Sequence, residues 1–202
     1  MDRRTVASVV PDKAPGMDPG AKAHAEERRL VAAARHERDA FVVLYRTYVG
    51  PVYRYFAQQV HRPQDAEDLT ATTFSKALVS LDRYYDRGSF GSWLFGVARH
   101  TLGDYRRRYH PQVDVDLVAP ALVAVDQEPE AAALRAEQLR QLDALVRRLP
   151  ADQQEALALR FSGELSSAQV GVVMGRREGA VRMLVHRAVT TLRQQLGEEG
   201  RP

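Results

Sequence analysis

The sequence predicts an all-α protein with two small helical domains joined by an extended acidic linker. Apolar residues recur at helical spacing in two separate blocks of the chain. Between these blocks, residues 111–133 contain five acidic residues, three prolines and no basic residue, a composition typical of an extended linker. We therefore expect a tail over 1–20, a first domain over 21–110, the linker over 111–133, a second domain over 134–196 and a tail over 197–202.

Composition excludes several classes of function. The chain of 202 residues has no cysteine, so disulfides, thiolate metal sites and thiol catalysis are excluded. Its six histidines are scattered, and none lies three or four residues from another, as a helical metal site requires. No apolar run approaches the roughly 20 residues needed to span a bilayer, and the N-terminus has no signal-peptide core. We expect a cytoplasmic protein that does not bind membranes and needs no metal or cofactor.

Three helices are expected in the first part of the first domain. The N-terminal tail is rich in proline and glycine and poor in apolar residues, which favours disorder. A helix is expected to begin near Ala21 and to end at Gly50, because the next residue is a proline. Pro51 then opens a second helix, and a third begins at Gln64 or Asp65.

The first turn of that third helix carries Asp65, Glu67 and Asp68, and three interpretations of these acids are open. Carboxylates at this position complement the positive end of the helix dipole. Paired carboxylates can also act as general acid and base, but the sequence nearby supplies no nucleophile, metal ligand set or phosphate loop. The third interpretation is a docking surface for a basic partner.

A loop rich in aromatic residues precedes a basic helix. Gly88 and Gly91 mark the loop, Phe90 lies within it, and Trp93 and Phe95 follow. Aromatic rings beside arginines suit unstacked bases and their phosphates, whereas the same rings at helical spacing suit a core. Both interpretations are open for Trp93 and Phe95. The helix that follows carries the arginines that we place on DNA phosphates: Arg99, Arg106, Arg107 and Arg108.

Residues 165–196 indicate a helix-turn-helix. Ser166 and Gln169 can form a capping box at the start of the first helix, and Gly175 can end it in a left-handed turn. The second helix has one apolar stripe, formed by Val181, Leu184, Val185, Ala188 and Leu192. The residues that we place on duplex DNA lie on its other side and at its entry: Arg176, Arg177, Glu178, Arg182, Met183, His186 and Arg187.

The basic side of this hairpin could instead be an ordinary solvated helix face. From Ser166 to Leu196, however, five arginines stand against one acid, a balance that favours binding to a polyanion. Gly171 lies inside the first helix, where a glycine costs about 1 kcal/mol relative to alanine. A close approach of the two helices at Gly171 would explain that cost, so we favour a DNA-binding module.

The order of these segments resembles the extracytoplasmic-function sigma factors of the sigma-70 family, the promoter-recognition subunits of bacterial RNA polymerase. The family's first domain is similar to three segments of this chain, FVVLYRTYVGPVYRYF, DAEDLTATTF and FGSWLFGVARHTLGDYRRR. Its second domain is similar to LPADQQEALALRFSGELSSAQVGVVMGRREGAVRMLVHRAVTTL. The resemblance covers about residues 35–196.

The resemblance implies which residues meet which partner. Asp65, Glu67 and Asp68 match the acidic segment that docks on core RNA polymerase, whose beta and beta-prime subunits are the expected partners. The first domain would melt the minus-ten promoter element and hold it as single-stranded DNA. The second would read the minus-thirty-five element as duplex, and the linker would run toward the RNA exit path. The residues assigned to the minus-ten element are Arg87, Ser89, Phe90, Trp93, Arg99, His100, Arg106, Arg107 and Arg108.

On this basis the sequence predicts a sigma factor that directs RNA polymerase to a subset of promoters and is not itself an enzyme. One alternative is a conventional helix-turn-helix regulator that binds operator DNA and does not bind core polymerase, but it gives no reason for the aromatic loop or the acidic helix. A second is a helical adaptor that binds only proteins, which leaves the arginines of the C-terminal hairpin unexplained. The sequence leaves open whether an anti-sigma factor is a further partner.

Overall fold

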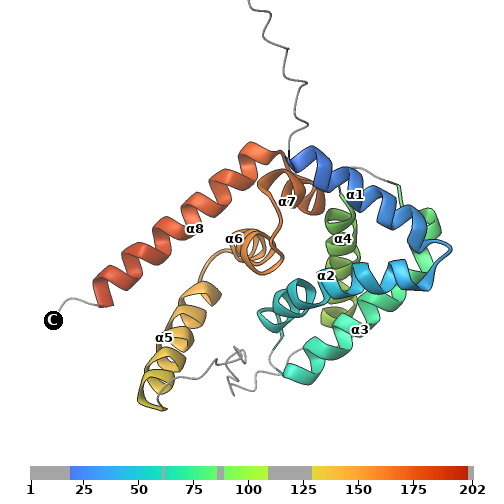
Figure 1. Ribbon diagram of the computed structural model, residues 1–202. Helices are drawn as coiled ribbons and strands as arrows, with labels where there is room; N and C mark the ends of the chain where they lie inside the picture. The colour runs from blue at the N-terminus through green and yellow to red at the C-terminus, as the bar shows by residue number, and fades with distance from the viewer. Residues whose placement is uncertain (1–18, 61, 86–88, 109–128, 200–202) are drawn as a thin grey trace, which may run out of the picture.

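The computed structural model describes residues 19–60, 62–85, 89–108 and 129–199, and every element in these ranges is helical (Figure 1). In chain order the elements are α1 (Pro19–Ala34), α2 (Arg38–Ala57), α3 (Pro63–Ser80), a short 3-10 helix η1 (Leu81–Arg83), α4 (Phe90–Arg108), α5 (Pro129–Arg147), α6 (Ala151–Leu157), a π-helical turn η2 (Ala158–Ser162), α7 (Ser167–Met174) and α8 (Glu178–Glu199). The all-α fold expected from the sequence is confirmed for the described residues.

The first four helices form one bundle. Helix α1 packs against α2, α2 against α3, and α3 against α4. Helix α1 also contacts the start of α4. The bundle has a continuous apolar interior, because the larger side chains of α2 and α4 point inward at helical spacing. Its fully buried side chains include Leu44, Val52, Tyr55, Phe56, Phe90, Leu94 and Phe95.

The helix boundaries around Gly50 differ from those expected. The sequence predicts one helix up to Gly50 and a new one from Pro51, but α1 ends at Ala34, and α2 continues through Gly50 and Pro51 to Ala57. A proline inside a helix removes one backbone hydrogen bond. The helix continues because both of its halves are buried: Leu44 lies on one side of Pro51, and Val52 lies on the other. Packing of that shared face therefore outweighs the local penalty.

The turn between α1 and α2 is fastened by a contact that the sequence does not suggest. Arg35 donates a hydrogen bond from Nη2 to the carbonyl oxygen of Tyr84 at 2.7 Å. Tyr84 itself follows η1 and is buried. The contact ties the start of the bundle to the segment that leads into α4.

The boundaries of the linker and tails are only partly described. Helix α5 begins at Pro129, five residues before the expected start of the second domain, because proline is well suited to the first turn of a helix. Helix α1 likewise begins at Pro19, two residues before the expected start of the first domain. Helix α8 continues to Glu199, three residues into the expected C-terminal tail. Residues 1–18, 109–128 and 200–202 lie outside the described residues.

The two predicted domains share one apolar core. Helices α5–α8 have a small cluster of their own, made of Leu149, Leu157 and Ala188. The larger cluster includes side chains of α1–α4 together with Leu159, Leu165, Val170 and Val181 from the second half of the chain. Figure 1 shows the resulting arrangement, in which α7 lies next to α4 while α5 and α8 extend away from the first bundle. In the described part of the chain, no helix combines the length and apolar character that a membrane span requires.

Candidate nucleic-acid interface

The helix-turn-helix expected near the C-terminus is formed by α7 and α8. The Ser166 side chain accepts a hydrogen bond from the backbone N–H of Gln169, and Gln169 Oε1 accepts one from the backbone N–H of Ser166 at 2.7 Å. The capping box is therefore complete. Gly175 ends α7 with φ of 66°, a left-handed conformation that glycine adopts without steric cost. Both local signals in the sequence are confirmed.

Gly171 marks the close approach of the two arms of the hairpin. A β-carbon at this position would lie 2.7 Å from the carbonyl oxygen of Arg176, on the chain that leads into α8. No side chain larger than hydrogen fits there without a backbone shift. The explanation expected for a glycine inside this helix is therefore confirmed.

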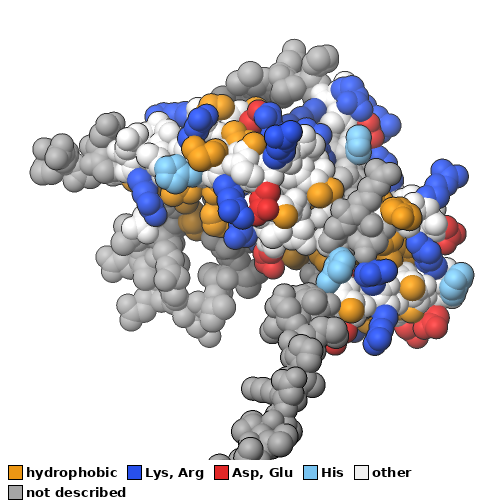
Figure 2. Space-filling model, turned by 90° about the horizontal axis from the view of Figure 1, so that it is seen from above, with side chains coloured by type: hydrophobic (Ala, Val, Ile, Leu, Met, Phe, Trp, Pro, Cys, Tyr) orange, Lys and Arg blue, Asp and Glu red, His pale blue; other side chains and the backbone are white. Residues whose placement is uncertain are grey.

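Helix α8 has an inner and an outer side. Val181 and Ala188 are fully buried, whereas Leu184, Val185 and Leu192 of the predicted stripe are half-buried. The outer side presents exposed side chains along the first turns of the helix and at its entry: Arg176, Arg177, Glu178, Arg182, Met183, His186 and Arg187. All seven residues placed on duplex DNA are thus exposed, two of them in the turn before α8 and five on α8 itself. Figure 2 shows that Lys and Arg side chains predominate over acidic ones on the face seen from above.

Two of these arginines form ion pairs within the protein. Arg182 pairs with Glu178 one helical turn earlier. Arg176 pairs with Asp152 at the start of α6. Both arginines are substantially exposed, and exposed pairs contribute little to stability, so a DNA phosphate can compete for each guanidinium.

The second basic surface is the outer side of α4. Arg99, His100 and the three consecutive arginines 106–108 are exposed. Arg106 donates to the amide oxygen of Gln59 at 2.6 Å, and Arg107 pairs with Asp104 at 2.5 Å. Arg106, Arg107 and Arg108 lie in the last turn of α4, where positive charge also complements the helix dipole.

The aromatic loop is placed differently from the base-binding interpretation. Phe90 is fully buried, and its ring centroid lies 5.5 Å from that of Tyr48 and 5.4 Å from that of Trp93. Ser89 is also buried, at 4% exposure. The assignment of Phe90 as a stacking surface is therefore wrong for this conformation, because its ring packs into the core of α1–α4. Arg87 and Gly88 lie outside the described residues.

The two interpretations of Trp93 and Phe95 resolve differently. Phe95 is fully buried against Tyr55, with ring centroids 5.6 Å apart, so it is a core residue. Trp93 is only half-buried and packs edge-on against Tyr84 at 5.2 Å. Trp93 thus keeps part of its surface exposed on α4, and Tyr85, just before the loop, is 77% exposed.

The three acids of α3 do not form a uniform surface. Asp65 accepts hydrogen bonds from Arg62 at 3.0 Å and from the hydroxyl of Tyr105 in α4 at 2.8 Å. It is half-buried and joins α3 to α4, so it is primarily a structural residue. Glu67 and Asp68 are exposed, and Asp68 faces a cleft between α3 and α4. These two side chains remain available to a partner.

Comparison with known proteins identifies two family segments in the chain. Residues 44–111 match sigma-70 region 2, and residues 139–192 match sigma-70 region 4. The sigma factor CarQ of Myxococcus xanthus is 32% identical over 166 residues, which cover 80% of this chain and 91% of CarQ. The chain belongs to the extracytoplasmic-function sigma factors of the sigma-70 family.

Further similarities agree with this membership. The extracytoplasmic-function sigma factor BldN of Streptomyces coelicolor is 38% identical over 168 residues, which cover 82% of this chain but only 63% of BldN. Among solved structures, the sigma factor RpoE of Bartonella quintana, in complex with the anti-sigma factor NepR, has a TM-score of 0.53 at 20% identity. That match covers 89% of this chain and 99% of the other, and it shows a common fold. We refer below to α1–α4 as the region 2 domain and to α5–α8 as the region 4 domain.

In this sigma factor the two domains meet through residues that the sequence did not single out. Glu155 of α6 accepts a hydrogen bond from Arg99 Nε at 2.6 Å, and this bond raises the pKa of the Arg99 guanidinium above its ordinary value. Gln169 donates from Nε2 to Ser89 Oγ at 2.8 Å. No local signal marks either contact, because the partners lie 56 and 80 residues apart.

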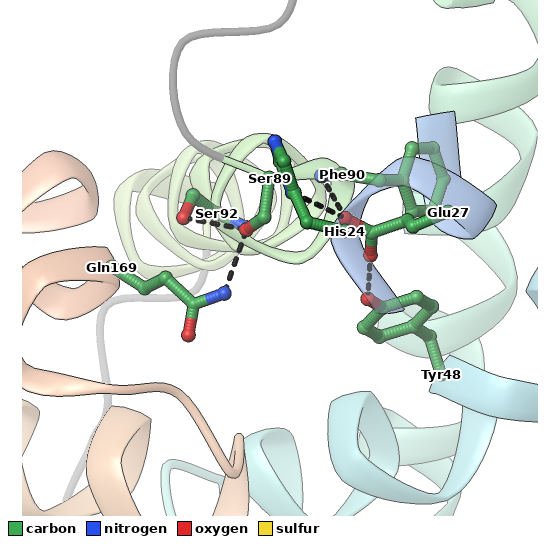
Figure 3. Close-up of polar contacts among 7 residues, drawn as sticks. All are labelled: His24, Glu27, Tyr48, Ser89, Phe90, Ser92 and Gln169. Atoms are coloured by element: carbon green, nitrogen blue, oxygen red, sulfur yellow. Dashed lines mark hydrogen bonds and ion pairs between the residues drawn. The ribbon is translucent and has the colours of Figure 1, made fainter. Parts of the chain in front are cut away.

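Glu27 of α1 is the other residue that sequence reasoning missed. Its carboxylate accepts hydrogen bonds from the Tyr48 hydroxyl and from the backbone N–H of Phe90 at 3.2 Å, as Figure 3 shows. The second bond satisfies the first free N–H of α4. Burial, reinforced by this carboxylate, raises the pKa of Tyr48 far above its usual value. Tyr48 therefore stays protonated as a hydrogen-bond donor, and Glu27 helps to fix where α4 begins.

Proposed function

We propose that this protein is a promoter-recognition subunit of bacterial RNA polymerase, with its region 2 domain acting at the minus-ten element and its region 4 domain at the minus-thirty-five element. The observation that carries the proposal is the exposed arginine-bearing side of α8, held on a complete helix-turn-helix in a chain that also contains region 2. A helix-turn-helix inserts the first turns of its second helix into the major groove. These are the turns that carry Arg182, Met183 and His186.

For the minus-ten element we propose Trp93, Arg99, His100 and the arginines at the end of α4. The exposed arginines would contact phosphates, and the accessible edge of Trp93 would contact an unstacked base. Phe90 would support this surface from inside the core. Ser89 would support it by capping the start of α4. The DNA contact expected for Arg87 stays a prediction from the sequence.

For polymerase docking we propose Glu67 and Asp68 as direct contacts and Asp65 as the residue that holds their helix in place. An exposed acidic helix turn is suited to a basic surface on core polymerase. The ties of Asp65 to Arg62 and Tyr105 would keep that turn at a fixed distance from α4. Docking and minus-ten recognition would thereby share one rigid unit.

The packed arrangement of the two domains constrains how such a protein works. The minus-ten and minus-thirty-five elements are separated by about 25 base pairs, or roughly 85 Å of B-form DNA at 3.4 Å per base pair. Arg99 of region 2 and Glu155 of region 4 are in contact here, at 2.6 Å. We infer that the domains separate when the protein engages both elements.

Partners and location follow from the same proposal. The protein would act in the cytoplasm with core polymerase, its beta and beta-prime subunits providing the docking sites, and it would have no catalytic activity or cofactor of its own. An anti-sigma factor is a further proposed partner, supported by the likeness to the RpoE chain that is bound to NepR.

The test is run-off transcription with core polymerase and a library of genomic promoters. The proposal requires that the full chain binds core polymerase and directs initiation from a defined subset. A chain that binds duplex DNA but neither binds core polymerase nor supports initiation would instead be a conventional helix-turn-helix regulator. Core binding is therefore the measurement that separates the two functions.

A further inference from the structure

Two side chains near the start of the chain hold both ends of the connection between η1 and α4. At one end, Arg35, the residue that follows α1, donates a hydrogen bond from Nη2 to the carbonyl oxygen of Tyr84 at 2.7 Å. At the other end, the carboxylate of Glu27 in α1 accepts a hydrogen bond from the backbone N–H of Phe90 at 3.2 Å. The backbone groups that enter and leave this connection are therefore fixed by the same short stretch of chain.

Glu27 is itself held by neighbouring side chains. Its carboxylate also accepts a hydrogen bond from the Tyr48 hydroxyl of α2, and His24 Nδ1 lies 3.8 Å from Glu27 Oε2 (Figure 3). A β-carbon on Gly91 would lie 3.2 Å from a ring carbon of Tyr48, so the first turn of α4 packs closely on the same tyrosine. A carboxylate at this place also complements the positive end of the α4 dipole. The start of α4 is thus fixed from both α1 and α2.

The aromatic side chains at the two ends of the connection pack against each other. The ring centroids of Tyr84 and Phe90 are 5.9 Å apart, and that of Trp93 lies 5.2 Å from the first and 5.4 Å from the second. Tyr84 and Phe90 are buried, whereas Trp93 is half-buried. This cluster brings the two ends together and leaves the exposed part of Trp93 beside them.

Tyr85 is an exposed ring next to this cluster. Tyr84 has an extended backbone, with φ of −61° and ψ of 125°, and successive side chains of an extended chain point to opposite sides. Accordingly, Tyr84 is 7% exposed and Tyr85 is 77% exposed. The carbonyl held by Arg35 belongs to the peptide bond that joins the two tyrosines. Tyr85 therefore extends into solvent from a fixed point, and an exposed aromatic ring is suited to stacking on an unstacked base.

Holding these rings in advance lowers the free-energy cost of capturing a base. A protein that opens duplex DNA must hold a base after it leaves the stack. A group that becomes ordered only when it binds loses conformational entropy at that step, and a group that is already in place avoids the loss. The contacts of Glu27 and Arg35 fix the backbone on which Tyr85 and Trp93 stand, so they affect this cost directly.

From these contacts we propose that Glu27 and Arg35 are positioning residues for melting of the minus-ten element. They hold Tyr85 and Trp93 in place, and Tyr85 stacks on an unstacked base beside Trp93. Glu27 and Arg35 act through the backbone of Phe90 and Tyr84 and do not contact DNA themselves. The inference rests on the proposed function, because it takes the region 2 domain as the part that opens the minus-ten element.

Melting is measured on holoenzyme made from core polymerase and the full chain, with a promoter selected by run-off transcription. The observable is the rate at which thymines of the minus-ten element become reactive to permanganate. Tyr85→Ala should slow melting about 5- to 100-fold, the range expected for the loss of one stacked base. Arg35→Met and Glu27→Ala should each slow it about 3- to 10-fold, because the rings must then be ordered during capture.

Two readouts separate positioning from a general loss of stability. A template already mismatched at the minus-ten element should restore initiation by all three variants, because the protein no longer has to open the duplex. Arg35→Lys keeps a donor for the Tyr84 carbonyl, and Glu27→Gln keeps an acceptor for the Phe90 N–H, so both should recover most of the melting rate. Slow initiation from the mismatched template, or no recovery in the conservative variants, would show that these residues only stabilise the fold.

The chain offers matched controls for each change. Glu26→Ala and Arg29→Met alter exposed residues of α1, and Tyr45→Ala removes an exposed tyrosine of α2. Among the described contacts, these residues hold neither end of the connection, so the three control proteins should melt the promoter at the rate of the unaltered protein. A control that slows melting as much as its partner variant would contradict the assignment, because the effect would then reflect the loss of a charge or of any exposed ring.

The hold on the aromatic cluster can also be measured on the free chain, since Trp93 is its single tryptophan. Arg35→Met should raise the quenching of Trp93 fluorescence by acrylamide, because Tyr84 would pack less firmly against the indole ring. Arg29→Met should leave the quenching unchanged. Equal quenching in the two variants would show that Arg35 does not hold the cluster.

The unaltered holoenzyme separates this inference from the proposed function. If it initiates from selected promoters while Tyr85→Ala or Arg35→Met melts them at the normal rate, the inference is overturned and the proposed function stands. If the unaltered chain supports no initiation, the proposed function fails, and the inference fails with it. Arg35 and Tyr85 are exposed, so their variants decide the question even where Glu27→Ala does not fold.

Discussion

The region 2 and region 4 domains differ in how much of their core they supply themselves. Region 2 fully buries large side chains from its own helices, among them Leu44, Tyr55 and Phe56. Among the described residues, the separate cluster of region 4 has Leu149, Leu157 and Ala188 as its buried members. Five further buried residues of region 4 pack into the cluster of region 2: Ala158, Leu159, Leu165, Val170 and Val181. Separation would therefore uncover a larger share of the core of region 4. If the domains separate as proposed, region 4 would be the domain that most needs a partner.

The largest expected effect tests whether region 2 is stabilised by its own core. Phe90→Ala should lower the free energy of unfolding by about 3–5 kcal/mol, because it removes a fully buried ring and leaves a cavity. Phe161→Ala is the matched control: that ring is 62% exposed, and its loss should change stability by less than about 0.5 kcal/mol. Urea unfolding followed by circular dichroism gives both values. Similar values for the two variants would remove Phe90 from the core and return it to base stacking.

The second prediction asks whether region 2 presents its docking surface independently of its core. Asp68→Arg should weaken binding to core polymerase by several kcal/mol, because it replaces an attractive charge with a repulsive one. Helicity should be unchanged, since Asp68 is exposed. Asp82→Arg makes the same change at an exposed acid of η1 and should bind normally. Unchanged affinity for Asp68→Arg would leave only the helix-dipole interpretation of that acid.

The third prediction tests how tightly region 4 is built at its hairpin. Gly171→Ala should cost about 1–3 kcal/mol, because its β-carbon would meet the carbonyl oxygen of Arg176. Gly179→Ala meets no atom within 4 Å, so it should stabilise the protein by about 0.4–1 kcal/mol by restricting the unfolded chain. Thermal unfolding compares the two variants. A stabilising Gly171→Ala would contradict the close approach of α7 and α8.

The fourth prediction concerns the DNA-binding surface of region 4. Arg182→Ala should weaken binding to duplex containing the minus-thirty-five element by about 1–3 kcal/mol if Arg182 reads a base. Arg193→Ala, at an exposed position six residues beyond Arg187 in α8, should have a smaller effect. Fluorescence anisotropy on cognate and scrambled duplexes measures both. An equal loss on every sequence would reassign Arg182 to phosphate.

The sequence by itself determined the elements whose signals are local. The capping box at Ser166, the left-handed turn at Gly175 and the close approach at Gly171 each depend on a few neighbouring residues. The inward and outward sides of α8 followed from helical periodicity alone. These features could be predicted because their free energy comes from contacts within one or two turns of chain.

Only the tertiary structure decided the features that depend on distant partners. Pro51 lies inside α2 because the two halves of that helix share a buried face, and Phe90 is buried because Tyr48 and Trp93 surround it. The contacts of Glu155 with Arg99 and of Gln169 with Ser89 join domains that composition separates. All of these features depend on packing between segments that are far apart in the chain. The free energy of burial there exceeds the local conformational preference, and no periodic pattern in the sequence indicates such contacts.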